Sequence, residues 1–240
     1  MKAIITTRKD LSADIFRRHG WDVFIYGSDY GDSSKYDIVY FRDPFNDIGV
    51  LDKTVAERAI GLFKNARSID NVTSFDYLYE LEDKFNQYKM YRDLMPATFL
   101  PYECEFVKGR HLAKKRISQR SKDIYFDCPE QLGDDWIIQE LLDIKEELRV
   151  YVVFGEVIPQ ATIKAKVDGK VKIVGGRILN ENEISLCKEI ARRSNLNFIG
   201  IDLAVLNNGE LKLIEVNRSP QFIRFSEIYN ESVLTGILDI

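Results

Sequence analysis

The 240-residue sequence predicts a mixed α/β protein built from separate lobes. Over about the first 80 residues, short apolar segments alternate with helix-like segments, a pattern typical of a small parallel α/β unit. The C-terminal half contains long alternating segments, which favour an antiparallel sheet with helices, an α+β arrangement. The clearest single element is a β-hairpin at residues 200–220. The change of pattern along the chain indicates lobes with a cleft between them.

In the first part of the chain, three short strands are expected with two helices. Gly20 follows the first helix, expected at residues 11–19, and suits its C-terminal cap. The expected strands are Lys2–Thr6, Asp22–Tyr26 and Asp37–Phe41, and the second helix is Leu51–Lys64. The glycines here form no G-x-G-x-x-G motif, so we predict no dinucleotide site.

The middle of the chain is expected to contain one helix and a pair of strands. Asp83 suits the N-cap of a helix over Asp83–Met95, which Pro96 ends. The expected strands are Glu105–Lys115 and Ile124–Phe126. The loop between them, residues 116–123, is cationic and suits a cover over phosphate groups, although an exposed basic turn is an equally good interpretation.

The C-terminal half supplies the remaining elements. The expected strands are Trp136–Leu142, Glu147–Phe154 and Glu156–Ile163, with Lys164 at the end of the last one. The expected helices are Asn182–Ser194 and Phe222–Ile240. We therefore predict three parts: an N-terminal α/β lobe (1–80), a middle lid subdomain (81–140) and a C-terminal core subdomain (141–240).

The hairpin brings two carboxylates together. Asn208-Gly209 is the turn signal, and a turn centred there places Asp202 directly opposite Glu215. Asn217 lies on the same face, two residues further on. Like charges directly opposite each other are destabilising. Either lysine or arginine residues or solvent compensate these carboxylates, or a divalent cation such as Mg²⁺ lies between them.

Composition argues against several classes of function. The net charge of −4 disfavours a general nucleic-acid binder. His19 and His111 are the only histidines, which argues against a histidine zinc site or a Ser-His-Asp triad. Cys104, Cys128 and Cys187 form no Cys-x-x-Cys pair and predict reduced thiols in the cytoplasm. We find neither a membrane-spanning segment nor a signal peptide, so we expect no membrane partner.

Two motifs carry a resemblance to a known family. Gly200-Ile-Asp202, followed by Ile214-Glu-Val-Asn-Arg-Ser-Pro220, resembles a metal-binding hairpin written G-x-D … E-V-N-x-S-P. Ile138-Gln-Glu-Leu-Leu142, followed by Glu147-Leu-Arg149, resembles an adenine hinge and a D-I-R segment. Both motifs are those of the ATP-grasp superfamily and, within it, of the RimK-type glutamate ligases. The resemblance covers about residues 83–240, and the first 80 residues match only in general α/β character.

The resemblance implies an ATP-grasp fold with ATP bound between the middle and C-terminal subdomains, and Mg²⁺ or Mn²⁺ as its metal. The implied metal ligands are Asp202, Glu215 and Asn217. The implied ATP-binding residues are Lys84, Lys114, Glu140, Leu141 and Glu147, and the implied catalytic cations are Arg149 and Lys164. Simpler explanations exist for three of these residues, since Glu147 and Arg149 could form a surface ion pair and Lys164 could be solvated.

The phosphate loop departs from the family pattern. The family has K-x-x-x-G-S-x-G-x-G, whereas this chain has no glycine in residues 114–123. Glycine permits close approach of the backbone to phosphate, so Arg116, Arg120 or Lys122 could take over the contact. Whether such a loop supports efficient turnover is open, as is the choice between Lys114 and Lys115 for the phosphate lysine. Arg218, inside the metal motif, could bind an anionic substrate or point to solvent.

The implied activity is that of an ATP-dependent carboxylate–amine ligase, which forms an amide or peptide bond through an acyl phosphate and releases ADP and phosphate. The expected substrates are a small amino acid or the C-terminus of a peptide or protein, and a homodimer or homotetramer fits the family. Two alternatives stay open. The first is an ATP-binding scaffold or regulator without turnover, favoured by the glycine-free loop; the second is a small-molecule kinase.

Overall fold

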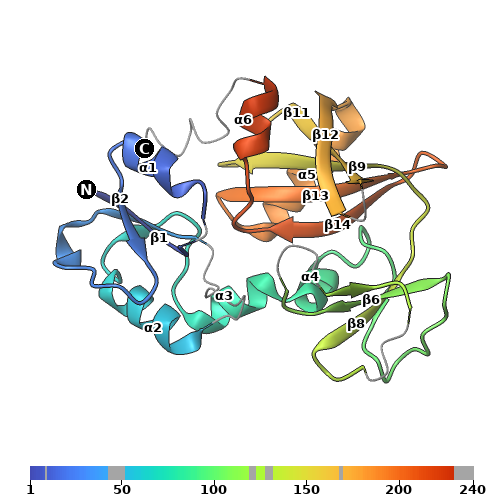
Figure 1. Cartoon of the computed structure of the whole chain (residues 1–240), viewed down its shortest axis with the longest axis horizontal. Helices are drawn as coiled ribbons and strands as arrows, with labels where there is room; N and C mark the ends of the chain where they lie inside the picture. The colour runs from blue at the N-terminus through green and yellow to red at the C-terminus, as the bar shows by residue number, and fades with distance from the viewer. Residues whose placement is uncertain (9, 43–51, 119–122, 128–131, 168–169, 230–240) are drawn as a thin grey trace.

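The computed structural model describes residues 1–8, 10–42, 52–118, 123–127, 132–167 and 170–229. Three sheets follow one another along the chain and form three lobes (Figure 1). The first lobe lies at the left of the view, the last sheet at the upper right, and the middle sheet at the lower right. None of the described helices is long and apolar enough to cross a membrane.

The first sheet is parallel, as predicted. Its strand order is β2-β1-β3-β4, from β1 (Lys2–Thr6), β2 (Asp22–Ile25), β3 (Ile38–Phe41) and β4 (Arg67–Ser68). Its helices are α1 (Ala13–Arg18), α2 (Lys53–Leu62) and the 3₁₀ turn η1 (Ser33–Lys35). Gly20 follows α1 with φ +77°, which confirms the predicted cap. Asp52 begins α2 by accepting the Val55 N–H, whereas Leu51, where we expected the helix to start, lies outside the described residues.

Two helices lead to the middle sheet. α3 (Phe75–Glu82) was not predicted, and α4 (Lys84–Met90) is shorter than the expected helix 83–95. Asp83 caps α4 as predicted, because its carboxylate accepts the N–H groups of Phe85 and Asn86. After Met90 the chain turns so that the Leu94 carbonyl accepts the Leu213 N–H at 2.9 Å, which draws this segment out of the helix.

The middle sheet is antiparallel, with the order β5-β8-β6-β7. Its strands are β5 (Thr98–Phe99), β6 (His111–Lys115), β7 (Ile124–Tyr125) and β8 (Trp136–Glu140). The expected strand 105–115 therefore begins only at His111. Residues 107–111 form a turn instead, in which the Val107 carbonyl accepts from the N–H groups of both Arg110 and His111.

The last sheet is the largest, with the order β12-β11-β9-β13-β14, and β10 pairs with β9. Its strands are β9 (Ile144–Val153), β10 (Glu156–Val157), β11 (Gln160–Val167), β12 (Lys170–Ile178), β13 (Phe198–Leu206) and β14 (Leu211–Asn217). The expected strand 156–163 is divided near Pro159, which lacks an N–H for the ladder. β11 continues to Val167, so Lys164 lies within it rather than at its end. β12 was not predicted.

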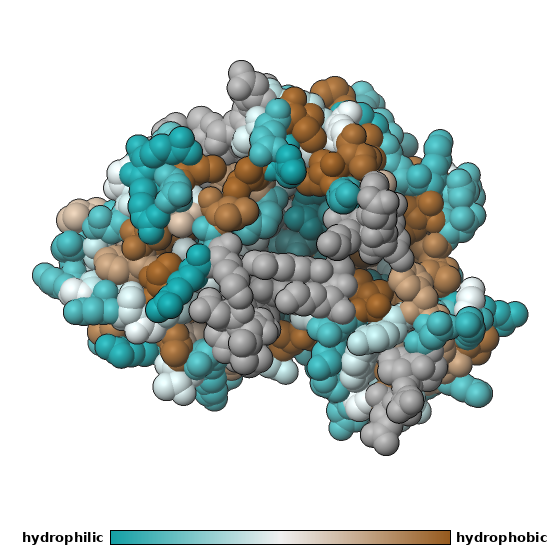
Figure 2. Space-filling model, viewed as in Figure 1, coloured by the Kyte–Doolittle hydropathy of each residue, from teal (hydrophilic) through white to brown (hydrophobic). Residues whose placement is uncertain are grey.

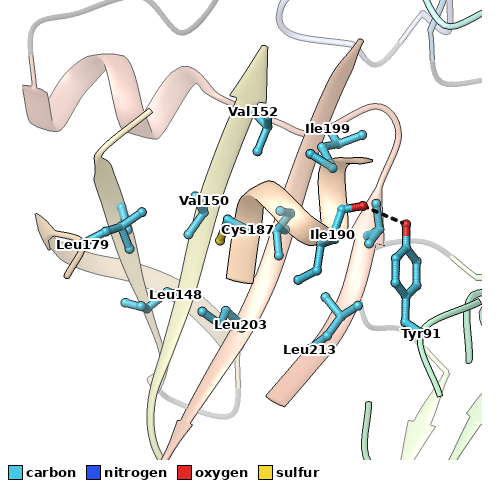
Figure 3. Close-up of a cluster of buried hydrophobic side chains, with 14 of the residues drawn as sticks. Tyr91, Leu148, Val150, Val152, Leu179, Cys187, Ile190, Ile199, Leu203 and Leu213 are labelled. Atoms are coloured by element: carbon cyan, nitrogen blue, oxygen red, sulfur yellow. Dashed lines mark hydrogen bonds between the residues drawn. The ribbon is translucent and has the colours of Figure 1, made fainter. Parts of the chain in front are cut away.

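The helices α5 (Glu181–Ser194) and α6 (Ile223–Tyr229) pack against this sheet. The rest of the helix expected to Ile240 lies outside the described residues. α5 covers one face, where Leu148, Val150 and Val152 of β9 meet Cys187 and Ile190 of α5 in the main apolar core (Figure 3). Because side chains alternate along a strand, the intervening residues of β9 point to the opposite face. That face carries the polar residues described below.

The predicted hairpin is present, and one extra residue sets its pairing. Asp202 pairs with Glu215 as predicted, but Leu203 pairs with Leu213, so Ile214 is an additional residue on β14. The turn also differs from the expectation, since only Gly209, at φ +85°, has a positive φ within it. A three-residue loop ending in glycine fits this geometry.

A side chain covers the end of the free edge of β14, next to the bond between Leu94 and Leu213. The Gln87 amide of α4 accepts the Val216 N–H at 3.0 Å and donates to the Val216 carbonyl at 2.9 Å. Gln87 also donates to the Leu81 carbonyl at 3.0 Å and is buried. One glutamine therefore joins α3, α4 and the strand that carries the metal motif.

We expect Gln87→Leu to lower the free energy of unfolding by about 2–4 kcal/mol, because it leaves two buried backbone groups of Val216 unsatisfied. Asn86→Ala, one residue earlier on a partly exposed position, should cost less than about 1 kcal/mol. Urea unfolding followed by circular dichroism measures both. Equal stability of the two variants would contradict the role given to Gln87.

Candidate functional site

A row of charged side chains crosses the polar face of the last sheet. Asp202 on β13 pairs directly with Arg149 on the central strand β9. The Arg149 guanidinium donates from Nε and Nη2 to the two oxygens of Asp202, the second bond being 2.7 Å. Lys164 on β11 donates to Asp202 at 2.7 Å and to Glu147 at 2.7 Å. Four of the predicted site residues therefore form one connected network.

Two further predicted residues extend the row onto β14. Glu215 lies opposite Asp202, and the Lys84 ammonium group is 3.5 Å from a Glu215 oxygen. Asn217 donates its side-chain N–H to Asp202 at 3.3 Å. The sequence interpretation offered compensation by lysine and arginine as one explanation for the facing carboxylates, and the structure shows these ion pairs. Within the described part of the chain, no group of three or more His, Cys, Asp and Glu side chains could hold a metal.

Burial and pairing set the charge of this network. Burial alone would raise the pKa of Asp202, but Arg149 and Lys164 outweigh it and hold the pKa well below its usual range. Burial acts to lower the pKa of Arg149, and Asp202 more than compensates and raises it. Asp202 is therefore a carboxylate at every pH at which the protein would normally be studied.

Lys114 belongs to the same cluster, although it comes from the middle sheet. It is buried, and its ammonium group donates to Gln139 at 2.7 Å. Burial lowers the pKa of Lys114 to about 8, and the charges of Glu215 and Lys84 act on it as well. The neighbouring Lys115 faces away, half-exposed, 3.5 Å from Asp135. The geometry thus favours Lys114 over Lys115 as the lysine of the cleft.

Gln139 is a site residue that the sequence interpretation missed. It accepts from Lys114 and donates to the Thr98 hydroxyl at 2.8 Å, and Thr98 in turn donates to the Pro96 carbonyl at 2.9 Å. The only signal in the sequence was a polar residue within the apolar strand 136–140, which is buried along its first four positions. This chain of hydrogen bonds fixes the position of the Lys114 ammonium group.

Glu140 and Leu141 lie at the end of β8, apart from the charged cluster. Within the described ranges, neither residue forms a hydrogen bond or ion pair with that cluster. The N–H of Glu140 donates to the Ala97 carbonyl and that of Leu141 to the Arg110 carbonyl, both at 2.8 Å. The adenine contacts expected of these two residues therefore stay a prediction.

The start of the glycine-free loop is attached to α4. Arg116 donates to the buried carboxylate of Asp83 at 2.6 Å, so it does not point at the cluster as a phosphate contact. Lys84 donates to the Ser118 carbonyl at 3.1 Å and also approaches Glu215. Arg120 and Lys122, the other cations considered for this role, lie outside the described residues.

Arg218 does not point to solvent, which was one of the two interpretations of its position. It is 2% exposed and donates to the Phe41 carbonyl of the first lobe and to Glu82 at the end of α3, the latter at 3.3 Å. The Arg218 carbonyl accepts from the Tyr40 hydroxyl at 3.3 Å. Arg218 is thus a structural link between the metal motif and the first lobe.

Gly200 is a second residue whose role was not foreseen. A Cβ at this position would lie 2.5 Å from Pro220 Cβ and 3.2 Å from Arg149 Cδ. Only glycine therefore lets the Arg149 stem and Pro220 approach β13 this closely. Figure 2 shows hydrophilic residues gathered in a hollow near the centre of the molecule, between the lobes.

Comparisons with known proteins identify the fold of this chain. No family model matches the sequence, and no curated protein is similar to it. Solved structures do match over nearly the whole chain. The macrocyclase MdnC of Microcystis aeruginosa MRC, bound with the precursor peptide MdnA, is 14% identical over 100% of this chain and 98% of its own, with a TM-score of 0.69.

Two further structures agree. The D-cycloserine synthetase DcsG is 16% identical over 99% of this chain and 96% of its own, with a TM-score of 0.68. The ATP-grasp ligase PsnB, complexed with a minimal precursor, is 15% identical over 99% and 97%, with a TM-score of 0.67. The chain therefore has the ATP-grasp fold, as predicted. At this level of identity the likeness establishes the fold alone.

Gly200→Ala should displace Arg149 or Pro220, because the new methyl group overlaps both. We expect a loss of about 1–3 kcal/mol in the free energy of unfolding. Gly109→Ala is the control for the general cost of removing a glycine, since a Cβ there meets no atom within 4 Å, although its φ of +80° adds strain. If Gly200→Ala were as stable as the unchanged protein, the close approach described here would be wrong.

The lowered pKa of Lys114 predicts proton uptake when a phosphate group binds. Below about pH 8 the lysine is already protonated, whereas above it an added anion raises its pKa and draws in a proton. Calorimetry of Mg-ADP binding at pH 8.5, in buffers of different ionisation enthalpy, should show an uptake of a fraction of a proton that shrinks at pH 7. The uptake should disappear in Lys114→Met and persist in Lys115→Met; uptake that survives in Lys114→Met contradicts the assignment.

Proposed function

We propose that the protein is an ATP-dependent carboxylate–amine ligase that forms an amide or peptide bond through an acyl phosphate. The observation that carries the proposal is the composition of the charged cluster within an ATP-grasp fold. Four cations (Lys84, Lys114, Arg149 and Lys164) surround three carboxylates (Glu147, Asp202 and Glu215), which leaves one excess positive charge. Such a site suits a phosphate-bearing ligand that brings its own divalent cation.

The donor set fits Mg²⁺. Asp202 and Glu215 face each other from neighbouring strands, and the Asn217 amide contacts Asp202, so hard oxygen donors come together. Mg²⁺ is typically held by one or two carboxylates together with substrate phosphates, which does not require a third acidic side chain. Arg149 and Lys164 now neutralise Asp202, so a metal held by Asp202 would share its carboxylate with these cations. The metal would supply charge stabilisation for the transferring phosphoryl group.

Each remaining residue has a proposed role in binding ATP. Lys114 and Lys84 contact the phosphates from the middle lobe and from α4. Glu147 binds the ribose hydroxyls, and the backbone at Glu140 and Leu141 borders the adenine. Solved structures of PsnB hold Mg and ADP together with a precursor peptide, which supports the choice of nucleotide and metal for this chain.

The chemistry has two steps. An oxygen of the substrate carboxylate attacks the γ-phosphorus of ATP, the bond to the β-phosphate oxygen breaks, and ADP leaves. An amine nitrogen then attacks the acyl carbon, phosphate leaves with the bonding electrons, and the amine loses a proton to solvent. Arg149 and Lys164 stabilise the negative charge on the acyl phosphate during both steps. The cleft must exclude water, because an acyl phosphate hydrolyses.

The substrate class that we favour is a peptide with a reactive carboxylate. MdnC and PsnB were solved with precursor peptides, and both match nearly the whole of this chain. The RimK-type assignment rests on the sequence motifs at residues 138–149 and 200–220. DcsG, a D-cycloserine synthetase by name, has the same fold, so a small-molecule substrate is the alternative to a peptide.

The test is ADP release in the presence of Mg-ATP, a carboxylate substrate and an amine, with mass spectrometry of the products. We expect release to require both substrates and to fall at least ~100-fold in Asp202→Asn, which removes a carboxylate at the proposed metal site. Asp134→Asn, an exposed position outside the cluster, is the control.

Three other outcomes would contradict the ligase assignment or the assignment of the metal site. Mg-ATP binding without turnover over a broad peptide and amino-acid panel indicates a nucleotide-binding regulator. A stable phosphorylated product without an amide indicates a kinase. Unchanged turnover in Asp202→Asn removes the metal assignment.

A further inference from the structure

A cavity lies between the helices that link the lobes and the end of the last sheet, apart from the charged cluster. Its volume is about 450 Å³, within the range of small-molecule sites. It is bordered by α3, α4, the end of α5 and the end of β14. The lining residues include Tyr77, Leu81, Met90, Tyr91, Arg193 and Arg218. None of the ten residues predicted for ATP, metal or catalysis lines it.

Much of the cavity wall is apolar. Tyr91 belongs to this part, and its hydroxyl donates to the Ile190 carbonyl of α5 at 3.3 Å, so the ring is held at the margin of the main core (Figure 3). A ligand with an apolar body gains affinity here, because the body leaves water when it contacts this wall. The other apolar lining residues are Leu81, Met90, Leu196 and Val216.

One wall carries a buried guanidinium whose hydrogen bonds are incomplete. Arg218 lines the cavity and is 2% exposed. Its Nε donates to Glu82 at 3.3 Å, and its Nη1 donates to the Phe41 carbonyl. Its Nη2 is buried and has no hydrogen-bond partner among the described residues. A buried charged donor without a partner is costly, so Arg218 favours any ligand that brings a hydrogen-bond acceptor to it.

The nearby carboxylate of Asp70 does not complete these bonds. Its Oδ2 is 3.8 Å from Arg218 Nη1, which is beyond hydrogen-bond distance, and it has no hydrogen-bond partner of its own in the described part of the chain. Burial raises the pKa of Asp70 to about 6, although Arg218 acts to lower it. Arg218 is therefore shared at long distances between Asp70 and Glu82, and neither carboxylate accepts from Nη2.

A second donor belongs to the same end of the cavity. Tyr77 of α3 lines the cavity and is half-buried, and its hydroxyl forms no hydrogen bond within the described ranges. Burial raises the pKa of Tyr77, and the charges of Asp70, Arg218 and Glu80 act on it as well. The hydroxyl thus keeps its proton at neutral pH and lies within range of the Arg218 charge.

The remaining charges at the cavity are paired or exposed. Arg193 is ion-paired with Asp93 at 2.6 Å and with Glu189 at 2.8 Å. Glu80 is exposed, so water and salt screen its charge. The end of α5 is the negative end of the helix dipole, but Arg192 and Arg193 in its last turn oppose that effect. The buried end of the cavity, with its unused donors, therefore decides which ligand group binds.

We propose that this cavity binds small carboxylates with an aromatic or aliphatic body, with the carboxylate toward Arg218 and Tyr77 and the body against the apolar wall. A carboxylate forms charge-assisted hydrogen bonds with a guanidinium, which are stronger than those of a neutral acceptor. A small inorganic anion would leave the apolar wall without a partner. The proposal does not depend on the proposed ligase activity, since the cavity shares no residue with the charged cluster.

Calorimetry on the whole chain at pH 7, without nucleotide, tests the class of ligand. 3-Phenylpropionate should bind at least about tenfold more tightly than phenethylamine, which has a similar body and the opposite charge. It should also bind at least about tenfold more tightly than acetate, which lacks the body. Equal binding of 3-phenylpropionate and either of the other probes, or no binding, overturns the proposal.

Tyr77→Phe tests the position of the carboxylate, because it removes one hydroxyl and keeps the ring. We expect it to weaken 3-phenylpropionate binding about fivefold or more. Tyr79→Phe makes the same change at an exposed position of α3 and should leave the affinity within about twofold. If the two variants bind the probe equally well, the carboxylate does not lie where we place it.

Met90→Trp tests the position of the apolar body. Met90 lines the cavity and is 46% exposed, so a larger side chain can fill the space without disturbing the core. It should abolish binding of 3-phenylpropionate, and retained binding places this probe elsewhere, for example in the charged cluster, and overturns the site. Glu80→Gln removes a like charge and should leave the affinity unchanged or higher; a loss would show that the cavity prefers a cation.

Discussion

The candidate site depends on one extra residue in β14. The turn of the hairpin sets a pairing in which Leu203 meets Leu213. Continued without interruption, that register would place Ile214 opposite Asp202 and turn Glu215 toward the apolar face beneath α5. A one-residue shift exchanges the two faces of a strand, so the bulge at Ile214 returns Glu215 to the polar face. Every contact between β14 and the charged row follows from it.

The ion pairs of the charged row share residues and form one network instead of isolated pairs. Lys164 donates hydrogen bonds to both Asp202 and Glu147. Arg149, on the central strand, donates to both carboxylate oxygens of Asp202. Removing one partner of a buried ion pair leaves an uncompensated charge, which costs more than the pair itself contributes. A shared network spreads that cost over several residues. In the middle lobe, Gln139 accepts a hydrogen bond from the buried ammonium group of Lys114 and so compensates part of the cost of burying it.

Local patterns predicted much of the fold and of the site. The parallel first sheet, the Asp83 cap and the facing of Asp202 and Glu215 followed from short-range signals, although the pairing arises from a bulge and not from the turn that suggested it. Contacts between residues distant in sequence could not be predicted from these local patterns. No sequence signal near Gln139 indicates that it accepts a hydrogen bond from Lys114, 25 residues earlier. Arg218 illustrates the same limit, since its environment is made by residues of the first lobe, distant in sequence.

The first lobe also matters for how such proteins can be recombined. Three backbone-directed bonds join it to the tail of the metal motif: the Tyr40 hydroxyl to the Arg218 carbonyl, Arg218 to the Phe41 carbonyl, and Arg42 to the Pro220 carbonyl at 2.8 Å. The segment that carries Asn217 is thus clamped from the outside by residues 40–42. A chimera that imports a foreign N-terminal module would have to bring equivalents of these three hydrogen bonds. Otherwise the segment after Asn217 loses its contacts with the first lobe, even if the sequence of the last sheet is unchanged.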